Sequence, residues 1–339
     1  MKGKKTALWT IVLLLLSAAF FAWLLRGADL AGIRSAVRQA RMHWLVAGVT
    51  LVALFLLCQA AALRMLLRRC GQHLGLLNSL RAALTGFYFS GITPSASGGQ
   101  PAQVWQLSRL GIPPGASAGA LLLMQIAYQA VMIVLGIASF LLCGGLIAGT
   151  HGGIRALLLY GFFAAAVVFA LLLGALVSGR RFEHAIAACI RCALLRRLIR
   201  NPDALCERLH RQIEQFNACA ALFAHSGRLS VQLLLITLVQ QLCILSVPCA
   251  VYCAFGLTGQ PLWRLVAAQA MLSIAVDTLP LPGAVGASES AFVAVQGLFF
   301  GPLALPAMLL SRGLSFYLTM AVAGVVTAIP LPHHSDAHA

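Results

Sequence analysis

The chain carries little charge, and very little of that charge is negative. Only 9% of its 339 residues are charged, whereas a soluble globular domain carries about a quarter. A protein this poor in charge cannot cover its surface for water, so the composition excludes an ordinary soluble protein. Hydrophobic residues make up 60% of the chain, in runs near the roughly 20 residues that span a bilayer. We expect an all-α, polytopic membrane helical bundle that forms a single domain over residues 1–331, followed by a disordered tail at 332–339.

The sequence also lacks the motifs of several common enzyme, metal and nucleotide sites. It has no His-Glu-x-x-His motif, no Walker loop and no Gly-x-Gly-x-x-Gly turn. Its ten cysteines include one CxxC pair, Cys189 and Cys192, and a zinc site needs a second pair. The net charge of +16 comes without an aromatic-interleaved basic face, which argues against a nucleic-acid partner. We expect no enzyme activity, no metal and no cofactor.

Apolar runs predict six membrane-spanning helices, and two further apolar stretches are broken by Pro and Gly. The predicted spans are residues 7–25, 44–67, 116–143, 154–178, 229–256 and 303–330. The broken stretches are 82–112 and 264–301. Segment 27–42 is too polar to span and predicts an interfacial amphipathic helix. The Arg-rich segment 180–228 predicts amphipathic helices on the cytoplasmic face.

Arginines set the expected orientation, because loops rich in Lys and Arg stay in the cytoplasm. The rule places 180–228 and 64–81 inside, so residues 26–42 lie outside despite their four arginines. The two spans after 82–112 already make a round trip between the inside segments. Segment 82–112 must therefore enter and leave on one side, as a re-entrant hairpin or a pair of short helices. By the same count, 264–301 dips in from the outside and both chain termini are cytoplasmic.

The two broken stretches resemble each other in where Pro and Gly fall before a short helix and then a long one. Gly99 and Gly286 are 187 residues apart, as are Gln125 and Arg312. Since the two stretches are expected to enter from opposite faces, the pattern predicts an inverted-topology repeat, the architecture of many transporters. Chance similarity is the alternative explanation for so few matching residues.

Broken helices within a bilayer leave backbone groups that lipid cannot satisfy, so these two loops must face protein or an aqueous cavity. The helices that begin after Gly98-Gly99 and near Gly286 would offer free N–H groups and a positive dipole end to a phosphate. The loops and the helices beside them supply the candidate substrate-binding residues. These are Thr93, Ser95, Gly98, Gly99, Gln100, Arg109, Gln125, Tyr128, Asp277, Gly286, Glu289, Arg312 and Ser315.

Three of these candidates are charged and are expected at membrane depth, where each costs at least about 2.5–3.5 kcal/mol if unpaired. Asp277, Glu289 and Arg312 either pair with one another to hold the two halves together or bind a headgroup. In the second case Arg312 would take a phosphate, and Asp277 or Glu289 an amine.

The uncharged candidates also have two interpretations each. Gln125 and Tyr128 share a helix face, which either joins helices or lines a path. Arg109 either snorkels to the membrane surface or holds the first loop. Ser95 and Gln100 either bind a substrate or satisfy the backbone of their own loop.

The run Ile92–Val104, followed by Ser108–Pro113, resembles the hallmark of the lysylphosphatidylglycerol synthase transmembrane-region family. This is the flippase-like membrane domain of multiple peptide resistance factor. Pro280–Ala291 is similar to the second signature of the family, and Arg312 falls where members often have an Arg opening the last helix. The resemblance implies that a lipid is moved between the leaflets of the bacterial inner membrane. The typical substrate would be an aminoacylated phosphatidylglycerol or a lipid-linked sugar carrier.

The chain departs from the family pattern in two ways. Gln125 and Tyr128 stand where many members carry an Arg or Glu and an Asp. No polar segment is long enough for the soluble aminoacyl-transferase domain of the full-length resistance factor, so we expect that domain to be lacking.

A flippase-like protein with membrane lipids as its partners, through an anionic or zwitterionic phospholipid headgroup, is the leading hypothesis. The alternative is a non-transporting membrane partner that recruits a separate lipid-modifying enzyme through the Arg-rich segment 180–228. A small-solute transporter is a third and weaker hypothesis.

Overall fold

A computed structural model describes residues 30–93, 96–148, 152–177, 226–277, 279 and 281–329. The predicted span 7–25, most of segment 180–228, Ser95 and the tail 332–339 lie outside these residues. Every regular element in the described part of the chain is a helix, which confirms the all-α prediction.

Five stretches of the described residues are long and apolar enough to cross a membrane. They are Met42–Arg69, Pro114–Leu142, Ala156–Gly174, Gly227–Ala254 and Pro282–Ala328. The first four confirm four of the predicted spans, and the predicted span 303–330 falls almost wholly within the fifth. In that fifth stretch the helix breaks fall at the predicted Pro and Gly residues, in η2 (Pro282–Ala284) and η3 (Gly301–Leu303). From Ala304 to Ala328 the backbone stays helical, as the predicted long helix required, with a π-helical segment at Gly313–Leu318.

The first broken stretch is a pair of short helices, α4 (Leu76–Ile92) and α5 (Gly99–Arg109), that turn back on each other. Their close approach depends on glycine. A Cβ added to Gly99 would fall 2.0 Å from Ser90 Oγ and 2.8 Å from the backbone oxygen of Gly86. Gln103 Nε2 on α5 donates to the Ala82 carbonyl on α4 at 3.0 Å, which fixes the antiparallel pairing. The stretch therefore returns to the side from which it entered, as the count of spans required.

The second broken stretch repeats this design. Helix α13 (Leu262–Asp277) leads through η2 (Pro282–Ala284) into α14 (Ala287–Phe300). Gln296 Nε2 on α14 donates to the Leu265 carbonyl on α13 at 3.0 Å. Both hairpins are thus closed by a buried glutamine amide that binds the backbone of the neighbouring helix.

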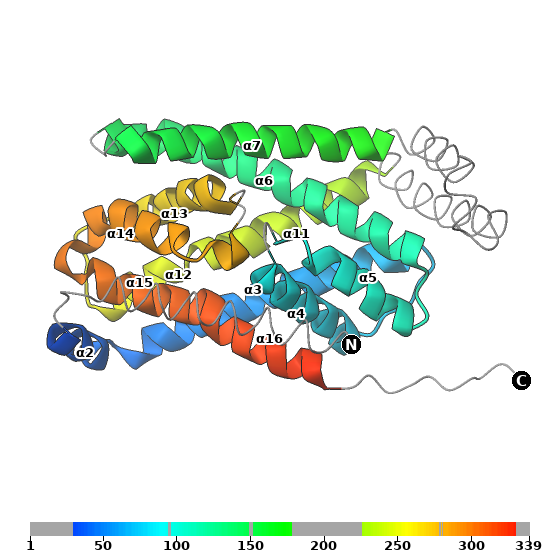
Figure 1. Cartoon of the computed structure of the whole chain (residues 1–339), viewed down its shortest axis with the longest axis horizontal. Coiled ribbons are helices and arrows are strands. Elements are labelled where there is room, and N and C mark those ends of the chain that lie inside the picture. The colour runs from blue at the N-terminus through cyan, green and yellow to red at the C-terminus, as the bar shows by residue number, and fades with distance from the viewer. Residues whose placement is uncertain are drawn as a thin grey trace, which may run out of the picture.

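The two hairpins lie in opposite halves of the bundle, with their loops toward its middle (Figure 1). Helices α3 (Met42–Arg69), α6 (Pro114–Ala148) and α7 (Gly152–Val177) run along the bundle. Each hairpin is packed in its own apolar cluster. Around α5 the cluster includes Leu63, Leu67, Leu107, Leu121 and Leu233, and around α14 it includes Leu265, Met271, Phe292, Phe300 and Met308.

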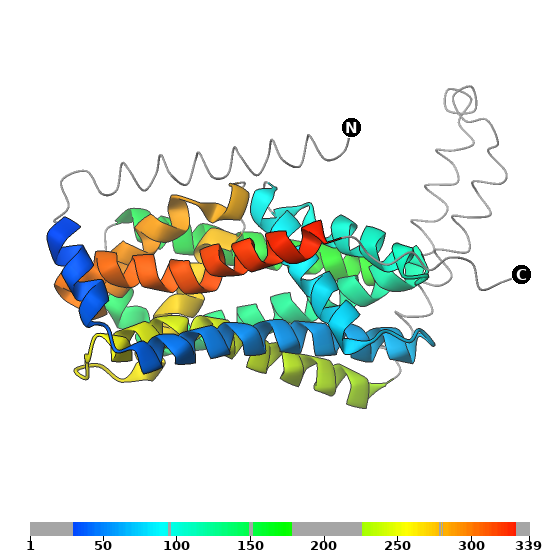
Figure 2. The ribbon, with the colours of Figure 1, turned by 90° about the horizontal axis from the view of Figure 1, so that it is seen from below.

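Helix α3 runs antiparallel to α11 (Gly227–Leu245) and α12 (Val247–Ala254), as Figure 2 shows. The Arg41 N–H at the start of α3 donates to the Ala254 carbonyl at the end of α12, at 2.9 Å. The last part of the chain forms η3 (Gly301–Leu303), α15 (Ala304–Arg312), η4 (Gly313–Leu318) and α16 (Thr319–Ala328). Helix α2 (Leu30–Gln39) packs against α15 at one end of the bundle.

The element bounds agree with the predicted 187-residue repeat. Helices α3, α4 and α5 begin at residues 42, 76 and 99, and α11, α13 and α14 begin at 227, 262 and 287. The packing agrees with the repeat as well. Helix α4 of the first hairpin lies along α16, and helix α13 of the second hairpin lies along α6. Each hairpin thus packs against the long helix that follows the other hairpin. The inverted repeat itself stays a prediction, because these agreements concern bounds and neighbours rather than a measured symmetry.

Gly99→Ala should destabilise the protein by about 1–3 kcal/mol, the usual cost of adding a methyl group to a closed contact. The added atom meets backbone of α4, which cannot rotate away. Thermal unfolding in detergent measures the change. Gly174→Ala is the matched control, because no atom lies within 4 Å of a Cβ at that position, and its unfolding temperature should stay equal or rise slightly. Equal unfolding temperatures for both variants would contradict the close-packed hairpin.

Candidate functional site

The second loop is held by a buried ion pair. Arg312 Nε lies 2.9 Å from Glu289 Oε1, and the Glu289 side chain is fully buried. Glu289 Oε1 also accepts from the Tyr317 hydroxyl at 3.4 Å. Its second oxygen, Oε2, accepts from the Gly286 N–H at 2.7 Å and from Ser288 Oγ at 3.1 Å. With both carboxylate oxygens occupied, Glu289 works as a cap on α14 and has no oxygen left for a substrate amine.

The loop needs this support because its backbone is unusual. Gly283 and Gly286 have positive φ angles of 58° and 88°. A Cβ on Gly283 would fall 2.4 Å from the ring of Phe316, so a side chain there would also clash. The carbonyl of Gly283 accepts from Arg312 Nη2 at 3.0 Å. Arg312 therefore satisfies the loop backbone in place of water.

These contacts leave part of the Arg312 guanidinium free to bind a further group. Its guanidinium stacks over the Phe316 ring at 4.4 Å, and its side chain is 17% exposed. Among the described residues, Nη1 of Arg312 has no hydrogen-bond partner. One edge of this cation is thus available to an anion, while the other edge is fixed by Glu289 and Gly283.

Asp277 joins the two halves of the bundle. Its Oδ2 accepts a hydrogen bond from the Tyr128 hydroxyl of α6. Asp277 is exposed and is close enough to feel the charge of Arg312, but the described residues contain no ion pair to it. The three charged candidates therefore divide: Glu289 and Arg312 pair, and Asp277 keeps an open carboxylate.

The first loop satisfies its own backbone. Thr93 Oγ1 accepts from the Gly98 N–H at 2.8 Å and donates to the Phe89 carbonyl at 2.6 Å. The Gly98 N–H, expected to face a phosphate, is therefore already bound. Two residues of α5 and α6 meet beside the loop, since Gln100 Nε2 lies 3.3 Å from Gln125 Oε1.

Two other predicted residues, Arg109 and Ser315, contact residues of their own helices. Arg109 ends α5, away from the loop, and lies over the Trp105 ring at 5.4 Å. Ser315 Oγ donates to the Ser311 carbonyl of the same helix at 2.7 Å. Arg109 therefore lies at the end of α5 away from the first loop, and its snorkelling stays a prediction.

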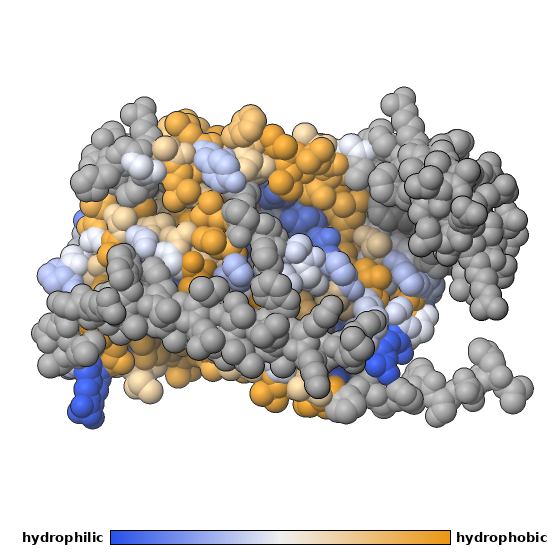
Figure 3. Space-filling view, viewed as in Figure 1, coloured by the Kyte–Doolittle hydropathy of each residue, from blue (hydrophilic) through white to orange (hydrophobic). Residues whose placement is uncertain are grey.

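The group that does come together lies between the two loops and α6. Its members are Gln100, Gln125, Tyr128, Asp277 and the free edge of Arg312. Figure 3 shows hydrophilic residues set back in the middle of a largely apolar face, between α6 and the loops. The arrangement places an open carboxylate within electrostatic reach of a cation with a free edge, which suits a ligand that carries both a negative and a positive group.

Sequence reasoning missed the aromatic residues that surround Arg312. Phe316 stacks on its guanidinium and Tyr317 binds its carboxylate partner. Both follow Arg312 by about one helical turn, so their spacing from Arg312 was the signal in the sequence that could have identified them. They lie in Gly313–Leu318, which winds as a π-helix, and π-helical turns are frequent at functional sites.

A Gly-x-Ser-x-Gly pattern is present at Gly115–Gly119 and has no catalytic geometry. It lies in the first turns of α6, and Ser117 is fully buried without a hydrogen-bond partner. A nucleophile elbow requires a serine exposed on a sharp turn between a strand and a helix. This serine is therefore a packing residue.

Glu289→Gln should lower the free energy of unfolding by about 3–5 kcal/mol, because it leaves the Arg312 charge without its partner. The double variant Glu289→Gln with Arg312→Gln should recover much of that loss. Asp277→Asn is the matched carboxylate control and should cost about 1 kcal/mol, since Asp277 is exposed with one hydrogen bond. Unfolding in detergent measures all three. Additive losses in the double variant would refute the pairing.

Comparison with known protein families covers the residues that form the site. A search of curated proteins finds no match. The family model described as "Lysylphosphatidylglycerol synthase TM region" matches residues 10–323, which include both hairpins and the final helices. The chain therefore belongs to the lysylphosphatidylglycerol synthase transmembrane-region family.

Proposed function

We propose that this protein moves a phospholipid, or a lipid-linked carrier, between the two leaflets of the bacterial inner membrane. Its family ties it to lipid handling in a membrane. The observation that carries the proposal is the Tyr128–Asp277 hydrogen bond, whose carboxylate lies within electrostatic reach of Arg312. This bond joins the two halves where the two loops meet, so separating the halves would break it and open the polar group to one side.

The arrangement of the hairpins supports alternating access. Transporters built from inverted repeats place the substrate site at the repeat interface, near the bilayer midplane, beside interrupted helices. Here each hairpin supplies one interrupted helix pair from its own end of the bundle (Figure 1). We infer that the 187-residue repeat is an inverted one and that the halves rock about the long antiparallel helices α3 and α11.

The open charges define the headgroup. Arg312 Nη1 is the donor for a phosphate, and the Asp277 carboxylate is the acceptor for an amine. A zwitterionic or aminoacylated headgroup satisfies both, while its acyl chains stay in the bilayer. Gln100 and Gln125 add neutral hydrogen-bonding groups, which bind hydroxyls or esters without the cost of burying a charge. The protein acts in this proposal as a transporter and not as an enzyme.

Asp277→Asn should slow the exchange of an amine-bearing labelled phospholipid by about 10- to 100-fold, because a hydrogen bond to a charged group is worth roughly 1.5–3 kcal/mol. Reconstitution of the full chain into vesicles, followed by a leaflet-accessibility assay, measures the rate. Tyr128→Phe should also change the rate, since it removes the bond that joins the halves. Thr50→Val is the control, because Thr50 is exposed on α3 and binds only the Val46 carbonyl of its own helix.

Unchanged exchange in Asp277→Asn and Tyr128→Phe would reject transport through this site. If deletions within 180–228 then abolished the cellular phenotype, the alternative function would stand, and the protein would recruit a lipid-modifying enzyme. The two outcomes are separable because one depends on Asp277 and Tyr128 and the other on the 180–228 segment.

A further inference from the structure

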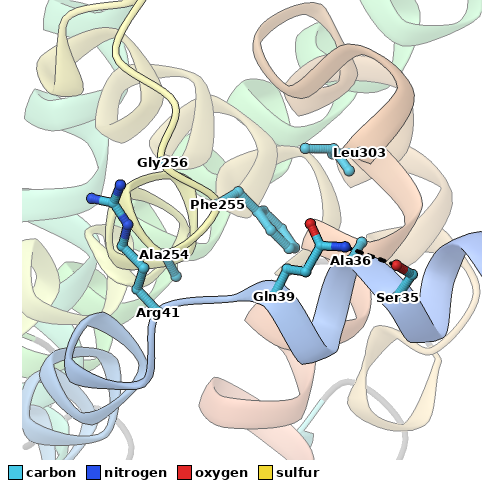
Figure 4. A pocket seen from close by; sticks show the side chains of 8 residues that line it. All are labelled: Ser35, Ala36, Gln39, Arg41, Ala254, Phe255, Gly256 and Leu303. Carbon is cyan, nitrogen blue, oxygen red and sulfur yellow. Dashed lines mark hydrogen bonds between the residues drawn. The ribbon is translucent and has the colours of Figure 1, made fainter.

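A second polar site lies at the end of the bundle that holds α2, far from the loops. A pocket of about 440 Å³ opens between the end of α2, the turn after α12, and η3. This volume is within the range of about 300–1,000 Å³ found for ligand sites. Its lining includes Ser35, Gln39, Arg41, Phe255, Gly256 and Leu303 (Figure 4).

Arg41 brings an unbalanced positive charge to this pocket. Its backbone N–H is held by the Ala254 carbonyl, but its guanidinium has no hydrogen bond or ion pair among the described residues. The guanidinium lies beside Gly256, where an added Cβ would be 3.6 Å from Arg41 Nη2. The side chain is therefore placed by its backbone anchor and by packing, with its donors open.

No described carboxylate is available to neutralise this end of the bundle. Asp277 and Glu289 are the two acidic residues in the described part of the chain, and both belong to the second hairpin. Arg34 and Arg38 add two further exposed positive charges on α2. An anion that settles here must therefore come from outside these residues.

The uncharged pocket residues are arranged to bind oxygen-rich groups. Gln39 Nε2 donates to Ser35 Oγ at 2.9 Å, which fixes the amide and leaves Gln39 Oε1 as an open acceptor. Ser35, having accepted that bond, keeps its own hydroxyl hydrogen for a ligand. Phe255 and Leu303 form the apolar part of the wall. Together with Arg41, these residues offer hydrogen-bond donors for a phosphate, an acceptor for a hydroxyl and an apolar surface for a lipid glycerol.

The surroundings place this pocket at the membrane surface. Trp44 and Trp263 are 37% and 47% exposed at the same end, and tryptophan gathers at the interface between lipid and water. Helix α2 covers the end of α15, with its charged residues on the exposed face. Arginines on the end opposite the Arg-rich 64–81 segment work against the positive-inside rule, so retaining them needs a compensating role.

We propose that this pocket binds the phosphate-bearing headgroup of an anionic phospholipid, with Arg41 as the main ligand to the phosphate. The site is separate from the central group and does not depend on transport. It would hold a lipid at the surface of one leaflet, beside the helices that support the second hairpin.

Binding of fluorescent phosphatidylglycerol to the full chain in detergent tests the proposal. Arg41→Gln should weaken binding about fivefold, the effect expected of one arginine near a lipid phosphate. Ala36→Phe should weaken it at least as much, because the ring fills the pocket while every charge is kept. Arg41→Gln should cause the same loss of binding in the unaltered protein and in the Asp277→Asn background, so failure of the central site and failure of this one are distinguishable.

Arg34→Gln is the matched control, because it removes the same charge from the same helix at a position that does not line the pocket. Its effect should stay below twofold. Two results would overturn the proposal: equal effects of Arg34→Gln and Arg41→Gln, or full binding by Ala36→Phe. Either would show that the lipid is attracted by the general surface charge of α2 and is not bound in the pocket. Displacement of the lipid by micromolar inorganic phosphate would also overturn the proposal, in favour of the free anion. Unfolding temperatures near that of the unaltered protein show that each variant is folded.

Discussion

The structure depends on one constraint, which is that backbone polar groups cannot be left unsatisfied inside hydrocarbon. Two helices of this bundle stop near its middle, and each stop exposes such groups. At the first, the Thr93 hydroxyl binds the Gly98 N–H. At the second, Glu289 binds the Gly286 N–H and Arg312 binds the Gly283 carbonyl. The same physical problem is solved once with a hydroxyl and once with an ion pair.

The second solution has chemical consequences that the first does not. A hydroxyl leaves the region neutral, whereas the ion pair places an arginine near the middle of the bundle with one edge still open. Removing an arginine from water costs several kcal/mol unless its donors are satisfied, so the open edge favours whatever anion reaches it. Tyr128 of the opposite half binds Asp277, whose carboxylate lies within electrostatic reach of Arg312. In the proposed function, loop support and headgroup binding use the same side chain.

Much of this arrangement could be predicted from the sequence, and the exceptions have physical reasons. Apolar runs located the spans, and Pro and Gly located the breaks, because both signals are local. The roles of Asp277 and Glu289 could not be separated, since both are single acids in apolar surroundings and differ only in their neighbours. Capping by Glu289 depends on its spacing from Gly286, and the Tyr128–Asp277 bond depends on two helices that are distant in sequence. At the first loop a local threonine binds the Gly98 N–H, a contact between two loop residues that the pattern of glycines did not indicate.

The pairing of Arg312 with Glu289 also decides how the protein responds to voltage. An elementary charge that crosses the full membrane potential gains or loses about 2.3 kcal/mol per 100 mV. Two opposite charges held 2.9 Å apart move as a neutral unit, so the field does almost no work on them. In the proposed transport cycle, the electrical work falls on Asp277 and on the charge of the lipid that would be carried.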